Sequence, residues 1–245
     1  MVEPAWQAFT GLSVLVALAL VGLARLSQGG VPTDAEALGS GHAASPRAVE
    51  GPADPDVSTG ALLVNVALSQ GVFGAVLLVG AWVTRVPPAA LGAGPGWLGL
   101  PALAAGVAGG LALYLGDESL AWVADRLGAP YSEAIRDLLA PDSATEWAVL
   151  LLGVLPVIAG FEELLFRGAL VGAVAAGVGV SPWVLAGASS ALFGFAHGAQ
   201  GPAGMVVTGL LGFALAALFV LTGSLAAAVL AHYLVDALEF LANET

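Results

Sequence analysis

The chain of 245 residues alternates long apolar runs with short polar connections. The runs cover residues 6–26, 60–83, 97–116, 146–180, 182–198, 203–222 and 224–242. Turn signals such as Pro87-Pro88, Ser181-Pro182 and Gly201-Pro202 separate several of them. About 20 helical residues at a rise of about 1.5 Å each cross a hydrocarbon core of roughly 30 Å. The pattern therefore predicts an all-α, polytopic transmembrane helical bundle of about seven spans.

The run 146–180 is longer than one upright crossing needs. Pro156 and Gly160 permit a kink, so this helix is predicted to be tilted, broken or equivalent to two spans. Two crossings here would raise the number of spans to eight. Seven is the preferred number.

The chain divides into two parts by composition. Residues 1–59 are predicted to be an N-terminal transmembrane anchor with a disordered acidic linker, and residues 60–245 the helical core. The linker, residues 27–58, has four prolines, five acidic residues and few large apolar side chains. Such a segment buries too little surface to offset the entropy of ordering it. His42 lies in this linker and is interpreted as a solvated loop histidine.

Residues 117–145 mix acidic residues, two arginines and apolar residues at roughly helical spacing. This pattern predicts short interfacial helices that turn an apolar face toward the headgroup region. A plain connector is favoured over a gating lid.

Composition narrows the function classes. The chain is 58% hydrophobic and 10% charged, contains no cysteine and has a formal net charge of −12, so disulfides and thiolate metal sites are excluded and nucleic-acid binding is not expected. All six basic residues are arginine. An acid-rich, lysine-free composition is typical of salt-loving prokaryotes and equally of GC-rich genomes, and both interpretations stay open.

The arginines also predict the orientation in the cell membrane. With the N-terminus outside, seven spans place Arg25, Arg47, Arg126 and Arg136 on the cytoplasmic side and Arg85 alone outside. Because cytoplasmic loops carry the excess of positive charge, this orientation is favoured, with the C-terminus in the cytoplasm.

Small residues recur within the apolar runs. They are Gly106, Gly109, Gly110, Gly209 and Gly212. Close helix packing accounts for them fully, and no chemistry is assigned to them.

Three charged residues stand within one apolar run: Glu162, Glu163 and Arg167. Each ionised side chain near the centre of a bilayer costs roughly 2.5–3.5 kcal/mol on the insertion scale. Such a cluster is therefore expected to face protein or water at a functional site.

Two further polar motifs follow in later runs. Phe193 precedes His197 by four residues, and His232 precedes Asp236 by four. Residues at this spacing share one face of a helix, as do Glu163 and Arg167. We predict that Arg167 pairs with Glu163 and leaves Glu162 about 100° away on another face.

Counting from the turns places the polar residues at comparable depths. From the turn at residues 181–182, Glu162 lies about 28 Å back and His197 about 24 Å forward at the helical rise. His232 and Asp236 lie about 14 and 20 Å beyond the turn near Gly223. All four are expected to line one cavity nearer the cytoplasmic face.

A carboxylate and an imidazole that hold one water are an economical general base for peptide hydrolysis, and a second imidazole can donate to the developing oxyanion. Simpler interpretations remain: a structural ion pair for Glu163 and Arg167, and a helix-to-helix hydrogen bond for each histidine.

The three motifs, in this order on successive helices, resemble the signatures of the CPBP intramembrane proteases. That family includes the type II CAAX prenyl endopeptidases and the Abi relatives linked to bacteriocin immunity and processing. The resemblance covers about residues 146–242. It implies an intramembrane glutamic-type endopeptidase acting on a peptide or protein that is membrane-anchored or lipidated.

The resemblance also assigns roles residue by residue. Glu162 and His197 would activate the water, Glu163 and Arg167 would hold the helix in register with support from Phe193, and His232 with Asp236 would stabilise the oxyanion. In the CAAX endopeptidases the last position is typically Asn. An ionised Asp would repel an oxyanion, so Asp236 would be protonated or would orient His232.

Two alternatives stay open. Glu162, His197 and His232 are a conceivable zinc ligand set, although a metal-free mechanism is favoured and no cofactor is expected. A different class of protein, a non-catalytic binding protein or proton-coupled transporter, would use the same polar cavity.

Overall fold

The computed structural model describes residues 3–28, 59–128 and 139–243. Within these ranges all regular structure is helical, which confirms the predicted fold class. One long helix, the fourth along the chain, is described in the next paragraph. The other principal helices are α1 (Trp6–Gln28), α3 (Thr59–Thr84), α4 (Leu100–Arg126), α9 (Pro182–Ala196), α10 (Gly201–Thr222) and α11 (Leu225–Asn243). Two short 3₁₀ turns, η1 (Pro88–Leu91) and η4 (Gly198–Gln200), lie between them.

The fourth helix is unbroken from Ala144 to Val178. Its successive parts are α6 (Ala144–Val149), η2 (Leu150–Val154), α7 (Leu155–Glu163), η3 (Leu164–Ala173) and α8 (Val174–Val178). The stretches η2 and η3 are π-helical, with the wider i→i+5 hydrogen bonding that occurs frequently at functional sites. Pro156 lies in the first turn of α7 and does not interrupt the helix. The long apolar run is therefore one helix, and the eight-span alternative is not supported.

Six helices in the described part of the chain are long and apolar enough to cross a membrane. The seventh, α9, has 15 residues, which at the α-helical rise is about 22 Å. It is shorter than the predicted run 182–198 because the chain leaves helical geometry at His197, which is the C-cap residue.

The prediction of short interfacial helices over residues 117–145 was partly wrong. Residues 117–126 are not a separate interfacial helix but continue α4 to Arg126, because no helix breaker follows Gly116 until Gly128, whose φ is 69°. Residues 129–138 of that prediction lie outside the described residues, and the fourth helix already begins at Ala144, inside the predicted stretch. Residues 29–58, including His42, are likewise outside the described residues.

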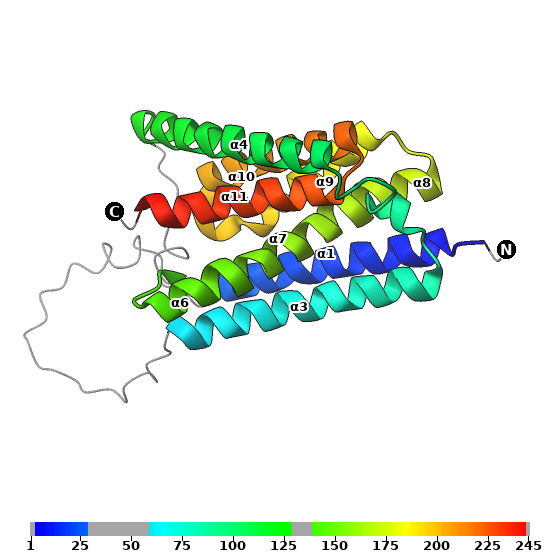
Figure 1. The fold of residues 1–245 in the computed structure, drawn as a ribbon, viewed down its shortest axis with the longest axis horizontal. Coiled ribbons are helices and arrows are strands. Elements are labelled where there is room, and N and C mark those ends of the chain that lie inside the picture. Colours follow the sequence, from blue (N-terminus) through cyan, green and yellow to red (C-terminus); the bar gives the residue numbers. More distant parts are fainter. Residues whose placement is uncertain (1–2, 29–58, 129–138, 244–245) are drawn as a thin grey trace, which may run out of the picture.

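The long fourth helix is the centre of the bundle. It contacts α1, α3, α9, α10 and α11 along its length. In Figure 1 it runs diagonally between α1 and α3 on one side and α4, α10 and α11 on the other. Every residue that this helix turns inward therefore meets another helix rather than lipid.

The helix that carries His232 is held from outside by α4. A Cβ on Gly106 would lie 2.9 Å from the carbonyl oxygen of Ala227, and one on Gly110 would lie 2.8 Å from the Cβ of Leu234. Only glycine permits this approach of α4 to α11. Gly106 and Gly110, two of the glycines predicted to serve helix packing, therefore position α11.

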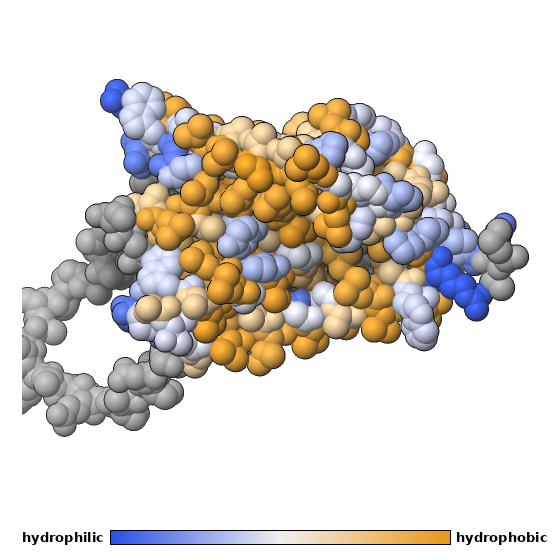
Figure 2. Space-filling view, in the orientation of Figure 1, coloured by the Kyte–Doolittle hydropathy of each residue, from blue (hydrophilic) through white to orange (hydrophobic). Residues whose placement is uncertain are grey.

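The surface is that expected for a membrane protein. Figure 2 shows apolar side chains over the middle of the visible face and hydrophilic ones near its two ends. The start of α1 and the end of α11 lie at opposite ends of the bundle, as an odd number of passes requires (Figure 1). The side that faces the cytoplasm stays a prediction.

Candidate functional site: a buried carboxylate and imidazole cluster

The three charged residues of the fourth helix are almost completely buried. Glu162 and Glu163 end α7 and are 6% and 0% exposed, and Arg167 in η3 is 1% exposed. Ionised groups removed from water are costly unless charged partners and hydrogen bonds surround them. The neighbouring helices supply these partners.

Glu163 is held by two cationic or polar partners. Its Oε1 accepts a hydrogen bond from Arg167 Nη1 at 2.7 Å and another from His232 Nδ1 at 2.7 Å. A carboxylate can only accept, so Nδ1 of His232 carries the proton in this pair. Arg167 also donates from Nη2 to the carbonyl oxygen of Gly212 at 2.8 Å. One carboxylate oxygen thus ties η3 to α11, and Arg167 ties it to α10.

The other ring nitrogen of His232 faces two further carboxylates. Nε2 lies 3.8 Å from Glu162 Oε2 and 3.6 Å from Asp236 Oδ2. Both distances exceed a direct hydrogen bond. Glu162 Oε2 is buried and has no hydrogen-bond partner in the described structure. Asp236 is the more accessible acid, with 24% of its side chain exposed.

Phe193 connects the second histidine to this cluster. Its ring centroid lies 4.5 Å from that of His197 and 6.0 Å from that of His232. The guanidinium of Arg167 lies 4.7 Å from the centre of the same ring, a cation–π contact. Both imidazoles and the arginine therefore pack around one aromatic side chain of α9.

His197 is oriented by the backbone of its own helix. Its Nδ1 lies 2.9 Å from the carbonyl oxygen of Phe193, and since a carbonyl only accepts, Nδ1 donates. Nε2 is left with its lone pair. His197 stands where α9 ends and η4 begins, so its ring sits at the edge of the helix rather than along it.

The structure brings the predicted residues together, with three differences of detail. Glu163 binds His232 as well as Arg167, although only the arginine was predicted. His232 is oriented by Glu163, whereas Asp236 lies too far from it for a hydrogen bond. Glu162 has His232 rather than His197 as its nearest histidine partner in the described residues.

Two supporting residues were not assigned to the site from the sequence. A Cβ on Gly212 would lie 2.9 Å from the Phe193 ring and 3.2 Å from Arg167 Nη2. Ser189 donates to the carbonyl oxygen of Phe166, inside η3, at 2.7 Å. A glycine or serine in an apolar run is too common to reveal such a contact in the sequence.

A protein metal site needs several ligand side chains that converge on one point. Over residues 3–28, 59–128 and 139–243, no three His, Asp or Glu side chains converge so that they could hold a metal ion. Glu162, His197 and His232, the conceivable zinc ligand set, do not form such a group within these ranges, and metal dependence stays a question for experiment. No step of the chemistry below uses a metal.

Fold and site together define a multi-pass α-helical membrane protein with a buried carboxylate and imidazole centre. Residues 144–238 match the family model described as type II CAAX prenyl endopeptidase Rce1-like. This match confirms, over residues 144–238, the resemblance to the CPBP proteases that the three motifs indicated. The family supports an intramembrane CAAX-type protease, whose substrate is a protein or peptide in a membrane. Comparisons with curated proteins and with solved structures gave no match.

Proposed function

We propose that the chain is an intramembrane glutamic-type endopeptidase in which Glu162 is the general base. The observation that carries this proposal is the convergence of Glu162 and Asp236 on one nitrogen of His232, at 3.8 and 3.6 Å. The acids come from helices far apart in sequence. If the ion pair between Glu163 and Arg167 served only the structure, neither Glu162 nor Asp236 would be needed beside His232.

Glu162 suits the role of base because its Oε2 is buried and free of hydrogen bonds in the described structure. A water that reaches this oxygen gives up a proton to it while the water oxygen attacks the peptide carbonyl carbon. The carbonyl double bond opens and leaves the charge on oxygen. The same proton then passes from Glu162 to the leaving amine as the C–N bond breaks.

His232 suits the role of oxyanion partner. Its Nδ1 proton is engaged by Glu163, so Nε2 is the only ring atom that can face a substrate. When protonated, Nε2–H donates to the oxygen on which negative charge develops. Glu163 is then a positioning residue, because it holds the imidazole in the orientation that this donation needs.

His197 suits the role of second partner of the water. Its Nδ1–H is engaged by the carbonyl oxygen of Phe193, which leaves the lone pair of Nε2 to accept from water. Asp236 Oδ2 lies 3.6 Å from Nε2 of His232. Its carboxyl would support His232 as a charged neighbour, and a protonated Asp236 could itself donate to the oxyanion.

The proposal extends to the substrate of the protein and to the side from which the substrate arrives. We infer a membrane-associated peptide or protein that reaches the carboxylate and imidazole cluster from the cytoplasm or laterally from lipid. Whether it carries a lipid group is left to experiment.

The test compares membrane peptidomes of cells that express the wild type, Glu162→Ala or Glu118→Gln. Glu118 is an exposed acid of α4 and serves as the matched control. Loss of general-base catalysis should lower cleavage by about 10²- to 10⁴-fold in Glu162→Ala, with the protein still inserted and folded. Cleavage by purified Glu162→Ala at the wild-type rate would show that Glu162 is not the general base.

The same assay with a chelator decides between water activation by Glu162 alone and zinc. We expect activity to persist. If no cleavage product appears in any strain while proton flux into proteoliposomes depends on Glu162, the transporter alternative is favoured instead.

A further inference from the structure

A second feature of the molecule lies away from the carboxylate cluster. Two apolar cavities adjoin along α3, of about 830 Å³ and about 750 Å³. They share four lining residues, Leu78, Trp97, Leu164 and Leu225. We call the combined cavity the lateral groove.

The lateral groove is open sideways, where lipid would lie. Several of its lining residues are strongly exposed, including Trp82 at 80%, Leu78 at 57% and Leu98 at 57%. It extends along α3 from Gln70 to Arg85, which at the helical rise is about 22 Å. One leaflet contributes half of a hydrocarbon core of about 30 Å, so its thickness is less than the length of the groove. A single acyl chain of a membrane lipid can therefore lie in the groove along its full depth in one leaflet.

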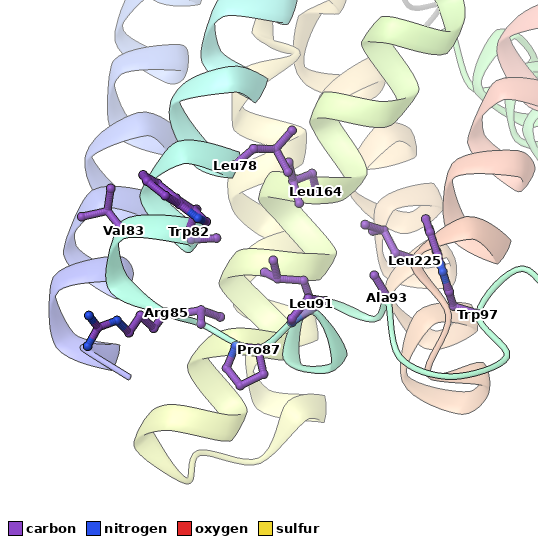
Figure 3. Close-up of a pocket in the computed structure, with 13 residues that line it drawn as sticks. Leu78, Trp82, Val83, Arg85, Pro87, Leu91, Ala93, Trp97, Leu164 and Leu225 are labelled. Carbon is purple, nitrogen blue, oxygen red and sulfur yellow. The ribbon is translucent and has the colours of Figure 1, made fainter. Parts of the chain in front are cut away.

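The groove has one charged residue, at its end. Arg85 follows α3 directly, and Figure 3 shows its side chain extending outward there, near Trp82 and Pro87. Arg85 is exposed and makes no ion pair within the described part of the chain. In a protein with a net charge of −12, it is the only Asp, Glu, Lys or Arg between residues 59 and 116. Among the residues that line the groove, Arg85 therefore supplies the only formal charge.

The backbone at this arginine is unusual. Arg85 is the only described non-glycine residue with a positive φ, 57°. A glycine would adopt this left-handed conformation at lower cost. The arginine side chain is thus present despite a conformational penalty. Trp82 and Trp97 line the groove with it, as tryptophans do at the headgroup level of a bilayer.

We propose that the lateral groove is a binding site for an anionic phospholipid, with the phosphate at Arg85 and one acyl chain along α3. The lipid would also contact the helices of the carboxylate cluster, because Phe161 and Leu164 line the groove from the fourth helix and Val229 and Tyr233 from α11. It would therefore brace α3 against both of them. This site does not depend on whether the protein is a protease.

The test is native mass spectrometry of the purified full-length protein with phosphatidylglycerol or phosphatidylcholine of identical acyl chains. The wild type should retain one phosphatidylglycerol in preference to phosphatidylcholine. One arginine near a membrane surface contributes an attraction equivalent to about fivefold in affinity for an anionic lipid. Arg85→Gln should lose about that preference, whereas Arg126→Gln, at the end of α4 and outside the groove, should keep it.

A second pair of variants tests the apolar part. Ala75→Phe, which fills the groove, should weaken binding of both lipids, whereas Val79→Phe, exposed on α3 but outside the groove, should not. Phosphatidylglycerol should also raise the midpoint of thermal unfolding of the wild type more than that of Arg85→Gln, since a ligand that binds only the folded state stabilises it. Equal loss of preference in Arg85→Gln and Arg126→Gln, or unchanged lipid binding in a folded Ala75→Phe, would overturn the proposal.

Discussion

The helix α3 and the long fourth helix are equally apolar by mean hydropathy, yet they are used in opposite ways. In their most apolar windows, 11% of the α3 residues and 56% of those of the fourth helix are buried within the protein. Charged residues are absent from α3, whereas Glu162, Glu163 and Arg167 lie in the fourth helix. The comparison shows that the charges stand where other helices surround them.

The difference has a simple physical reason. Lipid tails offer no hydrogen bonds, so an ionised side chain in a membrane must find its partners in protein or water. The fourth helix contacts five other helices, and two of them, α10 and α11, supply Gly212 and His232. An exposed helix such as α3 can instead supply an apolar surface.

The strongest way to break this contrast is to remove one member of the buried network. Arg167→Met leaves Glu163 fully buried without its main cation, which for a buried ion pair costs about 3–5 kcal/mol. We expect a large drop in thermal stability in detergent, together with loss of cleavage. The double variant Glu163→Gln with Arg167→Met should recover part of the stability. A double variant no more stable than Arg167→Met would contradict the pairing.

A smaller effect is expected from adding one methyl group beside the network. Gly212→Ala would press a Cβ against the Phe193 ring and Arg167, and overpacking of this kind costs about 1–3 kcal/mol. Gly209→Ala, three residues earlier on α10, meets no atom closer than 3.6 Å and should be tolerated. Unfolding midpoints of the two variants measure the difference. Equal midpoints would show that Gly212 is not a close-contact position.

Asp236 is the most accessible acid of the site and should be the easiest to change. Asp236→Asn removes a negative charge near the developing oxyanion and adds an amide donor. We expect kcat/KM to be within about threefold of the wild-type value or above it. A threefold change corresponds to less free energy than one typical hydrogen bond contributes, about 1 kcal/mol. Asp236→Leu should be clearly less active. A large loss in Asp236→Asn would mean that the ionised carboxylate itself is needed.

The smallest effect is expected on the lipid-facing surface of α3. Leu68 is 64% exposed, and substitutions at exposed positions without special contacts usually change stability by less than about 0.5 kcal/mol. Leu68→Ala should therefore unfold at nearly the same temperature as the wild type. Leu77, fully buried on the same helix, is the control that should be sensitive. Equal sensitivity would remove the contrast between the two faces.

Much of the fold followed from simple sequence patterns. The apolar runs located the helices within a few residues, since a membrane requires about 20 apolar residues for each crossing. The extension of α4 to Arg126 was missed because a change to polar composition at residue 117 does not by itself end a helix. The length of α9 was overestimated because apolar residues continue past His197, where the backbone turns.

The sequence predicted which residues form the site more readily than it predicted the contacts between them. The spacing of Glu163 and Arg167 places them on one helix face whatever surrounds them, and their ion pair is formed at 2.7 Å. No spacing predicts that His232, 69 positions away from Glu163, donates to the same oxygen. That contact depends on how α11 packs against the fourth helix.

The sequence by itself determined that the chain crosses the membrane several times, because its apolar runs are long enough to do so. It also determined that Glu162, Glu163, Arg167, His197, His232 and Asp236 lie in three short motifs of the later runs. Only the tertiary structure decided how those residues share their partners. Helix packing at Phe193, Gly106 and Gly110 brings α9 and α11 to the fourth helix, and so determines which nitrogen of His232 is engaged by Glu163 and which one faces Glu162 and Asp236.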